Sequence, residues 1–68
     1  MIKKGIYKHY KGNLYKVLGT ATHSESLENM VIYEKQYDDF SAWVRPIAMF
    51  EEWIEIEGKT IKRFEFVG

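Results

Sequence analysis

The chain has 68 residues, enough for one domain, and no cysteine, which excludes disulfides and thiolate metal sites. Stability must therefore come from packing, for which two Trp, five Tyr and four Phe supply large apolar side chains. The net charge is zero, no apolar run is long enough to span a membrane, and no secretion signal follows the N-terminal lysines. We expect a single cytoplasmic domain over residues 1–68 with no membrane partner.

The first half of the chain predicts two strands followed by a loop. Residues 5–10 are rich in aromatic side chains, and residues 11–13 (Lys-Gly-Asn) tolerate the backbone angles of a turn. Residues 14–22 alternate in polarity, as a half-buried strand does, and residues 23–29 are polar. The glycine inside the second strand indicates a bend or bulge, which a curled sheet needs. Period two predicts four residues on one face of this strand: Tyr15, Val17, Gly19 and Ala21.

The second half predicts more short strands. Residues 30–33 are apolar and β-branched, residues 36–41 form a polar loop, and residues 42–45 form a strand that Pro46 ends. Residues 46–50 fit one tight helical turn. An amphipathic helix continuing as far as Ile54, with proline at its first position, is the alternative for this region.

A C-terminal hairpin is favoured over that longer helix. Residues 53–57 alternate in polarity, Gly58-Lys59 supplies a turn, and residues 60–67 return as a last strand. Six short strands joined by tight turns are too few for two packed sheets, but they can curl into one small barrel. We therefore predict an all-β, antiparallel barrel of about five to six strands, with at most one short helical turn near residues 46–50.

Six short sequence motifs, in a fixed order along the chain, resemble those of a known family. Over residues 5–64 the chain resembles short bacterial proteins known as domain of unknown function 1653. The resemblance implies an SH3-like barrel and no activity. The chain departs from the family pattern at Lys62-Arg63, where a proline is expected before the arginine; this affects only the last strand. The motifs are His9-Tyr10-Lys11-Gly12-Asn13, Val17-Leu18-Gly19, His23-Ser24-Glu25, Val31-Ile32-Tyr33, Trp43-Val44-Arg45-Pro46 and Met49-Phe50.

Catalytic and metal-binding arrangements are not predicted. His23-Ser24-Glu25 has the residue types of a catalytic triad, but sequence neighbours seldom converge in that geometry. His9 and His23, with Glu25 or an aspartate, lack the short spacings typical of zinc ligands. The carboxylates of residues 51–57 fit a solvated strand face better than general acid–base work. We expect no catalytic residue, no metal and no cofactor.

The predicted partner surface combines aromatic side chains with an arginine. Trp43 and Arg45 share one face of a strand by period two, while Ala42 and Val44 take the other. The small side chains suit a barrel interior, so we expect Trp43 and Arg45 to face outward. Trp and Arg are the types most enriched at binding hot spots, which favours a non-catalytic module that binds a protein or peptide. The predicted site contains Trp43, Arg45, Tyr37 and Tyr10.

Two alternatives stay open. Residues 1–24 carry five lysines and no acid, whereas residues 25–57 carry nine acids against two cations. The first and last strands of small barrels often lie together, so basic segments at the two ends of the chain would meet and could bind nucleic acid. The second alternative is an accessory domain of an enzyme. The predicted basic patch contains Lys8, His9, Lys11, Lys16, Lys62 and Arg63.

Overall fold

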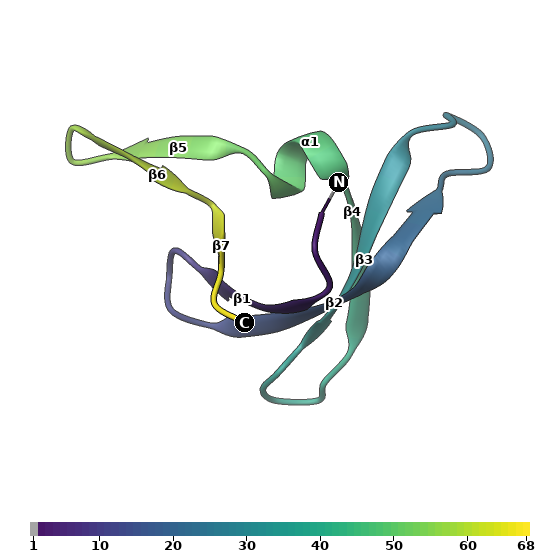
Figure 1. Cartoon of the computed structure of the whole chain (residues 1–68), viewed down its shortest axis with the longest axis horizontal. Helices are drawn as coiled ribbons and strands as arrows, with labels where there is room; N and C mark the ends of the chain where they lie inside the picture. The colour runs from purple at the N-terminus through teal and green to yellow at the C-terminus, as the bar shows by residue number, and fades with distance from the viewer. Residues whose placement is uncertain (1) are drawn as a thin grey trace.

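A computed structural model describes residues 2–68, which form seven strands and one helical turn (Figure 1). The all-β class and the helical turn after Pro46 are confirmed. There are seven strands because the predicted last strand breaks at Arg63. Within residues 2–68, no helix has the length and apolarity needed to cross a bilayer. The elements are β1 Gly5–His9, β2 Leu14–Thr22, β3 Asn29–Lys35, β4 Ala42–Pro46, α1 Ile47–Phe50, β5 Trp53–Ile56, β6 Lys59–Lys62 and β7 Phe64–Phe66.

Five of the strands form one curled antiparallel sheet in the order β4-β3-β2-β1-β7. The first and last strands are neighbours, with Tyr7 opposite Phe66 and Lys8 opposite Glu65. Strands β4 and β7 are the two edges of this sheet and do not pair with each other. Figure 1 shows α1 and β5 lying across the open side between these edges. Strand pairing therefore leaves a gap between β4 and β7, which side-chain packing and the backbone hydrogen bond from Arg63 N to Glu52 O (3.0 Å) bridge.

A β-bulge bends β2 at the position that its glycine predicts. Val17 lies opposite Tyr33 but Gly19 lies opposite Ile32, so Leu18 is an extra residue. Because the side-chain period of a strand is two, one extra residue moves all that follows to the other face. The predicted single face of β2 is therefore wrong beyond Val17: Gly19 and the alternate residue after it face away from the core.

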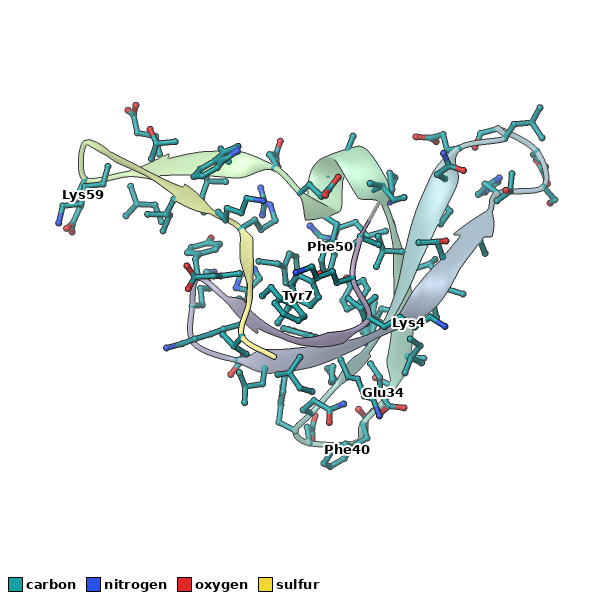
Figure 2. All side chains as sticks on the ribbon, viewed as in Figure 1. Lys4, Tyr7, Glu34, Phe40, Phe50 and Lys59 are labelled. Carbon is teal, nitrogen blue, oxygen red and sulfur yellow. The ribbon has the colours of Figure 1, made fainter. Side chains whose placement is uncertain are left out.

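The core is built from six buried side chains, which come from the strands of the curled sheet and from α1. Phe50 of α1 is only 1% exposed, and its ring stacks on that of Phe64 of β7, with centroids 4.1 Å apart and planes 5° apart. The same ring meets Tyr7 and Tyr33, each at 5.4 Å. Figure 2 shows Phe50 and Tyr7 pointing into the interior from α1 and β1. The six are Tyr7, Val17, Val31, Tyr33, Phe50 and Phe64.

Strands β5 and β6 form a separate hairpin that projects from the rest of the molecule (Figure 1). Glu57 and Gly58, with φ of 51° and 78°, make its two-residue turn, as a type I′ hairpin requires. The predicted turn is therefore wrong by one residue, since Lys59 already pairs with Ile56. The strand prediction for this segment is confirmed over the longer helix. Figure 2 places Lys59 near the tip of the hairpin.

Replacing Phe50 tests the closure of the sheet. Phe50→Ala is expected to lower the free energy of unfolding by about 3–5 kcal/mol, because a buried ring leaves a cavity. A chain of this size has about 3–10 kcal/mol in total, so the variant should be partly or wholly unfolded at 25 °C. The control is Met49→Ala on the same turn, 49% exposed, for which we expect a change below about 1 kcal/mol. Urea unfolding measures both, and equal midpoints would contradict the assigned role.

Candidate functional site

An open hollow of about 240 Å³ lies at the β4 end of the curled sheet, on the face that carries the core. The cross-strand pairs Tyr15–Lys35, Tyr33–Trp43 and Val31–Arg45 place its side chains on this one face. Tyr37 reaches it from the loop between β3 and β4. We call it the aromatic hollow, and its lining residues are Tyr15, Tyr33, Lys35, Tyr37, Trp43 and Arg45.

The predicted orientation of β4 is wrong. Ala42 and Val44 were expected to face inward, yet both are exposed, and Val44 is 61% exposed. Arg45 is instead half-buried on the face that β3 fills with buried core side chains. The reason is that the register with β3 decides which face of β4 meets the core. The small size of the Ala42 and Val44 side chains does not.

Trp43 forms an exposed rim of the aromatic hollow. Its side chain is 54% exposed even though it lies on the core-side face, because β4 is the edge of the sheet and no further strand covers it. Its indole Nε1 donates a hydrogen bond of 3.0 Å to the Ser41 hydroxyl. The indole therefore has its polar group satisfied while most of its apolar surface remains accessible, which is the state of many aromatic binding residues.

Tyrosines form the floor of the hollow. The hydroxyls of Tyr15 and Tyr37 share a hydrogen bond of 2.7 Å, and the Tyr15 ring packs edge-on against Tyr33 at 5.5 Å. Burial, reinforced by the hydrogen bond to Tyr37, raises the pKa of Tyr15 to about 12. Tyr15 is therefore neutral across the physiological range. The floor presents aromatic faces and hydroxyl groups and no negative charge.

The two cations of the hollow, Lys35 and Arg45, differ in their ion pairing. Lys35 is paired with two exposed carboxylates, Asp39 at 3.2 Å and Asp38 at 3.5 Å, and the hydrogen bond to Asp39 raises the pKa of Lys35. Arg45 donates through Nε to the Tyr33 hydroxyl at 3.4 Å. None of the ion pairs formed by residues 2–68 involves Arg45. The uncompensated positive charge of the hollow therefore lies on its guanidinium.

Three of the four predicted partner residues meet in the aromatic hollow. Trp43, Arg45 and Tyr37 all line it. Tyr10 does not, since it lies beyond the end of β1, with its ring 4.5 Å from that of His9. Tyr10 lines a separate hollow with Lys8, His9, Ile61, Lys62 and Glu65.

The predicted basic patch is gathered only in part. Lys8, His9 and Lys62 surround that second hollow, but the carboxylate of Glu65 lies among them. Arg63 is bound by Glu52, with 2.7 Å between Nη2 and Oε1. Lys16 lies opposite Glu34 on the outer face of the sheet, and the Lys11 ammonium lies 5.8 Å from the Tyr10 ring centroid. Carboxylates interrupt the cationic residues, so they do not form one continuous surface.

Sequence patterns missed half of the lining of the aromatic hollow: Tyr15, Tyr33 and Lys35. Each lies in a strand, and nothing local distinguishes it from a core or surface position. A cross-strand register would have identified them, because it aligns Tyr15 with Lys35 and Tyr33 with Trp43. Phe40 is a further exposed aromatic in the loop that carries Tyr37, at the loop tip labelled in Figure 2, with an unusual φ of 55°.

The loop that resembles a catalytic triad has a structural role. The ring Nδ1 of His23 accepts hydrogen bonds from the backbone N–H groups of Glu25 at 3.1 Å and Ser26 at 3.2 Å. The imidazole therefore caps its own loop, and no hydrogen bond within residues 2–68 joins it to the neighbouring serine hydroxyl. Across residues 2–68, no three His, Asp or Glu side chains gather as metal ligands would.

These features define a small, open, all-β protein with an aromatic hollow beside its edge strand. The chain belongs to the family of proteins of unknown function DUF1653, whose model matches residues 5–66. The predicted resemblance is thus confirmed. The chain is similar to a crystal structure of a DUF1653 protein from Bordetella bronchiseptica, with 30% identity and a TM-score of 0.90, over 98% of this chain and 88% of that one. A search of curated proteins gave no match.

His9 should make stability depend on pH near neutrality. Burial, with the positive charges of Arg63, Arg45 and Lys11, lowers the pKa of His9. The unfolded chain then binds more protons than the folded one just below the ordinary histidine pKa of about 6.5, so acidification destabilises the fold. Urea midpoints should fall from pH 7.5 to 5.5, and the fall should be smaller in His9→Gln. Asp39, whose lowered pKa has the same sign, contributes only below about pH 5. An equal fall in both proteins would contradict this assignment.

Proposed function

We propose that this protein is a non-catalytic binding module of the SH3-like barrel kind, and that it binds an extended peptide segment at the aromatic hollow. The observation that carries the proposal is an exposed Trp43 beside a tyrosine floor and an uncompensated Arg45. Trp, Tyr and Arg are the residue types that dominate binding energy at interfaces. Small barrels also bind peptides on aromatic grooves, an analogy that supports the class of function and no particular ligand.

The free edge of β4 supports an extended ligand. The hydrogen bond from Lys35 N to Ser41 O, 3.0 Å long, sets which residues of β4 bond to β3. By alternation, the backbone groups of Trp43 and Arg45 face β3, whereas those of Ala42 and Val44 face the free edge. A peptide that adds there as a sixth strand would hydrogen-bond to Ala42 and Val44. Its alternate side chains would lie beside Trp43 and Arg45 over the hollow.

Nucleic acid binding is less well supported. Its predicted surface is interrupted by Glu65 and Glu52, and the net charge of the chain is zero. Phosphate contacts need uncompensated cations, because the release of counterions supplies most of the affinity. This alternative stays a prediction, as does an accessory role beside an enzyme.

A matched pair of tryptophan variants tests the proposal. Trp43→Ala should weaken capture of a positional-scanning library of acetylated, amidated decapeptides by about 30-fold, the loss of about 2 kcal/mol typical of a hot spot. Its unfolding free energy should change by only about 1 kcal/mol, since the side chain is mostly exposed. The control is Trp53→Ala in the projecting hairpin, 60% exposed and next to Lys62 but outside the hollow. Its capture should match that of the parent.

Three results would contradict the proposal. The first is equal capture by Trp43→Ala and Trp53→Ala. The second is unfolding of Trp43→Ala, which would make this residue part of the core. The third is co-purified nucleic acid that salt removes and that binds less when Lys8 and Lys62 are neutralised, but equally well in Trp43→Ala.

A further inference from the structure

We propose that the aromatic hollow recognises a carboxylate, and that an aspartate or glutamate side chain within the bound peptide supplies it. This inference rests on the proposed function and names the chemistry of its ligand. The two half-buried arginines of the chain provide the comparison. Arg63 has an internal partner, Glu52, which accepts from Nε at 3.1 Å and from Nη2 at 2.7 Å. Arg45 has no such partner within residues 2–68.

The Arg45 guanidinium lies in a partly buried, aromatic environment, where a charge without an acidic partner is costly. Its guanidinium carbon lies 5.7 Å from the centroid of the buried Phe64 ring, and its only hydrogen bond to residues 2–68 runs from Nε to the Tyr33 hydroxyl. Neither Nη group has an acceptor among residues 2–68, and neither is fully buried, so both are open to a ligand. A half-buried charge loses hydration, and a carboxylate that bonds both Nη groups would restore that loss more fully than a neutral acceptor.

The acids closest to the hollow in sequence are already engaged. Asp38 and Asp39 are both held by Lys35, and Asp39 also accepts a hydrogen bond from the backbone N–H of Ser41 at 3.1 Å. One ammonium faces two carboxylates in these contacts, so Lys35 carries no uncompensated positive charge, and Arg45 is the cation of the hollow that has no ion pair within residues 2–68. Charge complementarity therefore assigns the negative group to the ligand.

The strand geometry favours an acid inside the peptide over one at its end. Trp43 and Arg45 are two residues apart on one face of β4, and strand β4 continues on both sides of this pair. An added strand would present side chains two positions apart to the same pair, about 6.6–6.8 Å from each other. The ligand pattern inferred is an apolar or aromatic residue, any residue, and then Asp or Glu, in either chain direction.

Peptide pairs that differ in one charge test the inference. The probes are acetylated, amidated decapeptides that carry the aromatic–any–glutamate pattern, and the same peptides with glutamine in place of glutamate. For the parent protein we expect the glutamate peptides to bind about tenfold tighter, a typical gain from a charge-assisted hydrogen bond. This preference should disappear in Arg45→Gln and persist in the matched control Arg63→Gln. Arg45→Lys, which keeps the charge but not the fork of donors, should keep part of it.

The possible results separate the two proposals. Equal binding of glutamate and glutamine peptides to the parent protein would overturn the carboxylate inference and leave the peptide site standing. Tighter binding of a glutamine peptide with a free C-terminal carboxylate would overturn the internal source of the acid. A preference that survives in folded Arg45→Gln would overturn the role of Arg45. Absence of any peptide binding at Trp43 would overturn both proposals. The comparison on the parent protein needs no variant, so it holds even where Arg45→Gln fails to fold.

Discussion

The stack of Phe50 on Phe64 is the contact on which the rest of the structure depends. The curled sheet has two edges, β4 and β7, that do not pair with each other, and the backbone hydrogen bond from Arg63 N to Glu52 O, 3.0 Å long, links the segments that connect them. Phe50 follows directly from β4 through the single turn of α1, and Phe64 begins β7. Their parallel rings join the two edges by side-chain packing, which is non-directional and needs no matched strand register. Phe50, on the single turn of α1, therefore packs across the gap where β4 and β7 do not pair.

Phe64 also links the core to the candidate site. One contact of the Phe64 ring is with Phe50, and another is with the guanidinium of Arg45. The aromatic hollow is thus an extension of the core at a place where the sheet runs out of strands. A side chain at this edge can lie on the core-side face and still be half exposed, as Trp43 is. The fold and the proposed binding at this edge therefore both depend on the position of the Phe64 ring.

Charge pairing decides which side chains of the surface are available. Several cations of the predicted basic patch have a carboxylate or an aromatic ring beside them in the fold, as Arg63 has Glu52 and Lys62 has Trp53. Arg45 also lies beside a ring, that of Phe64, but no ion pair within residues 2–68 gives it an acid, and this follows from its position in the fold. No count of charges along the chain could identify it.

The all-β class, the helical turn after Pro46, the bend at Gly19 and the family could all be predicted from the sequence, because they depend on local backbone preferences and on short motifs in a fixed order. Three features needed the folded structure: the face of β4 that meets the core, the position of Tyr10 away from the hollow, and the lining that Tyr15, Tyr33 and Lys35 form with Trp43. The reason is that strand faces are set by register between distant segments. A single bulge at Leu18 reverses every face after it, and period-two patterns in one strand carry no information about its neighbour.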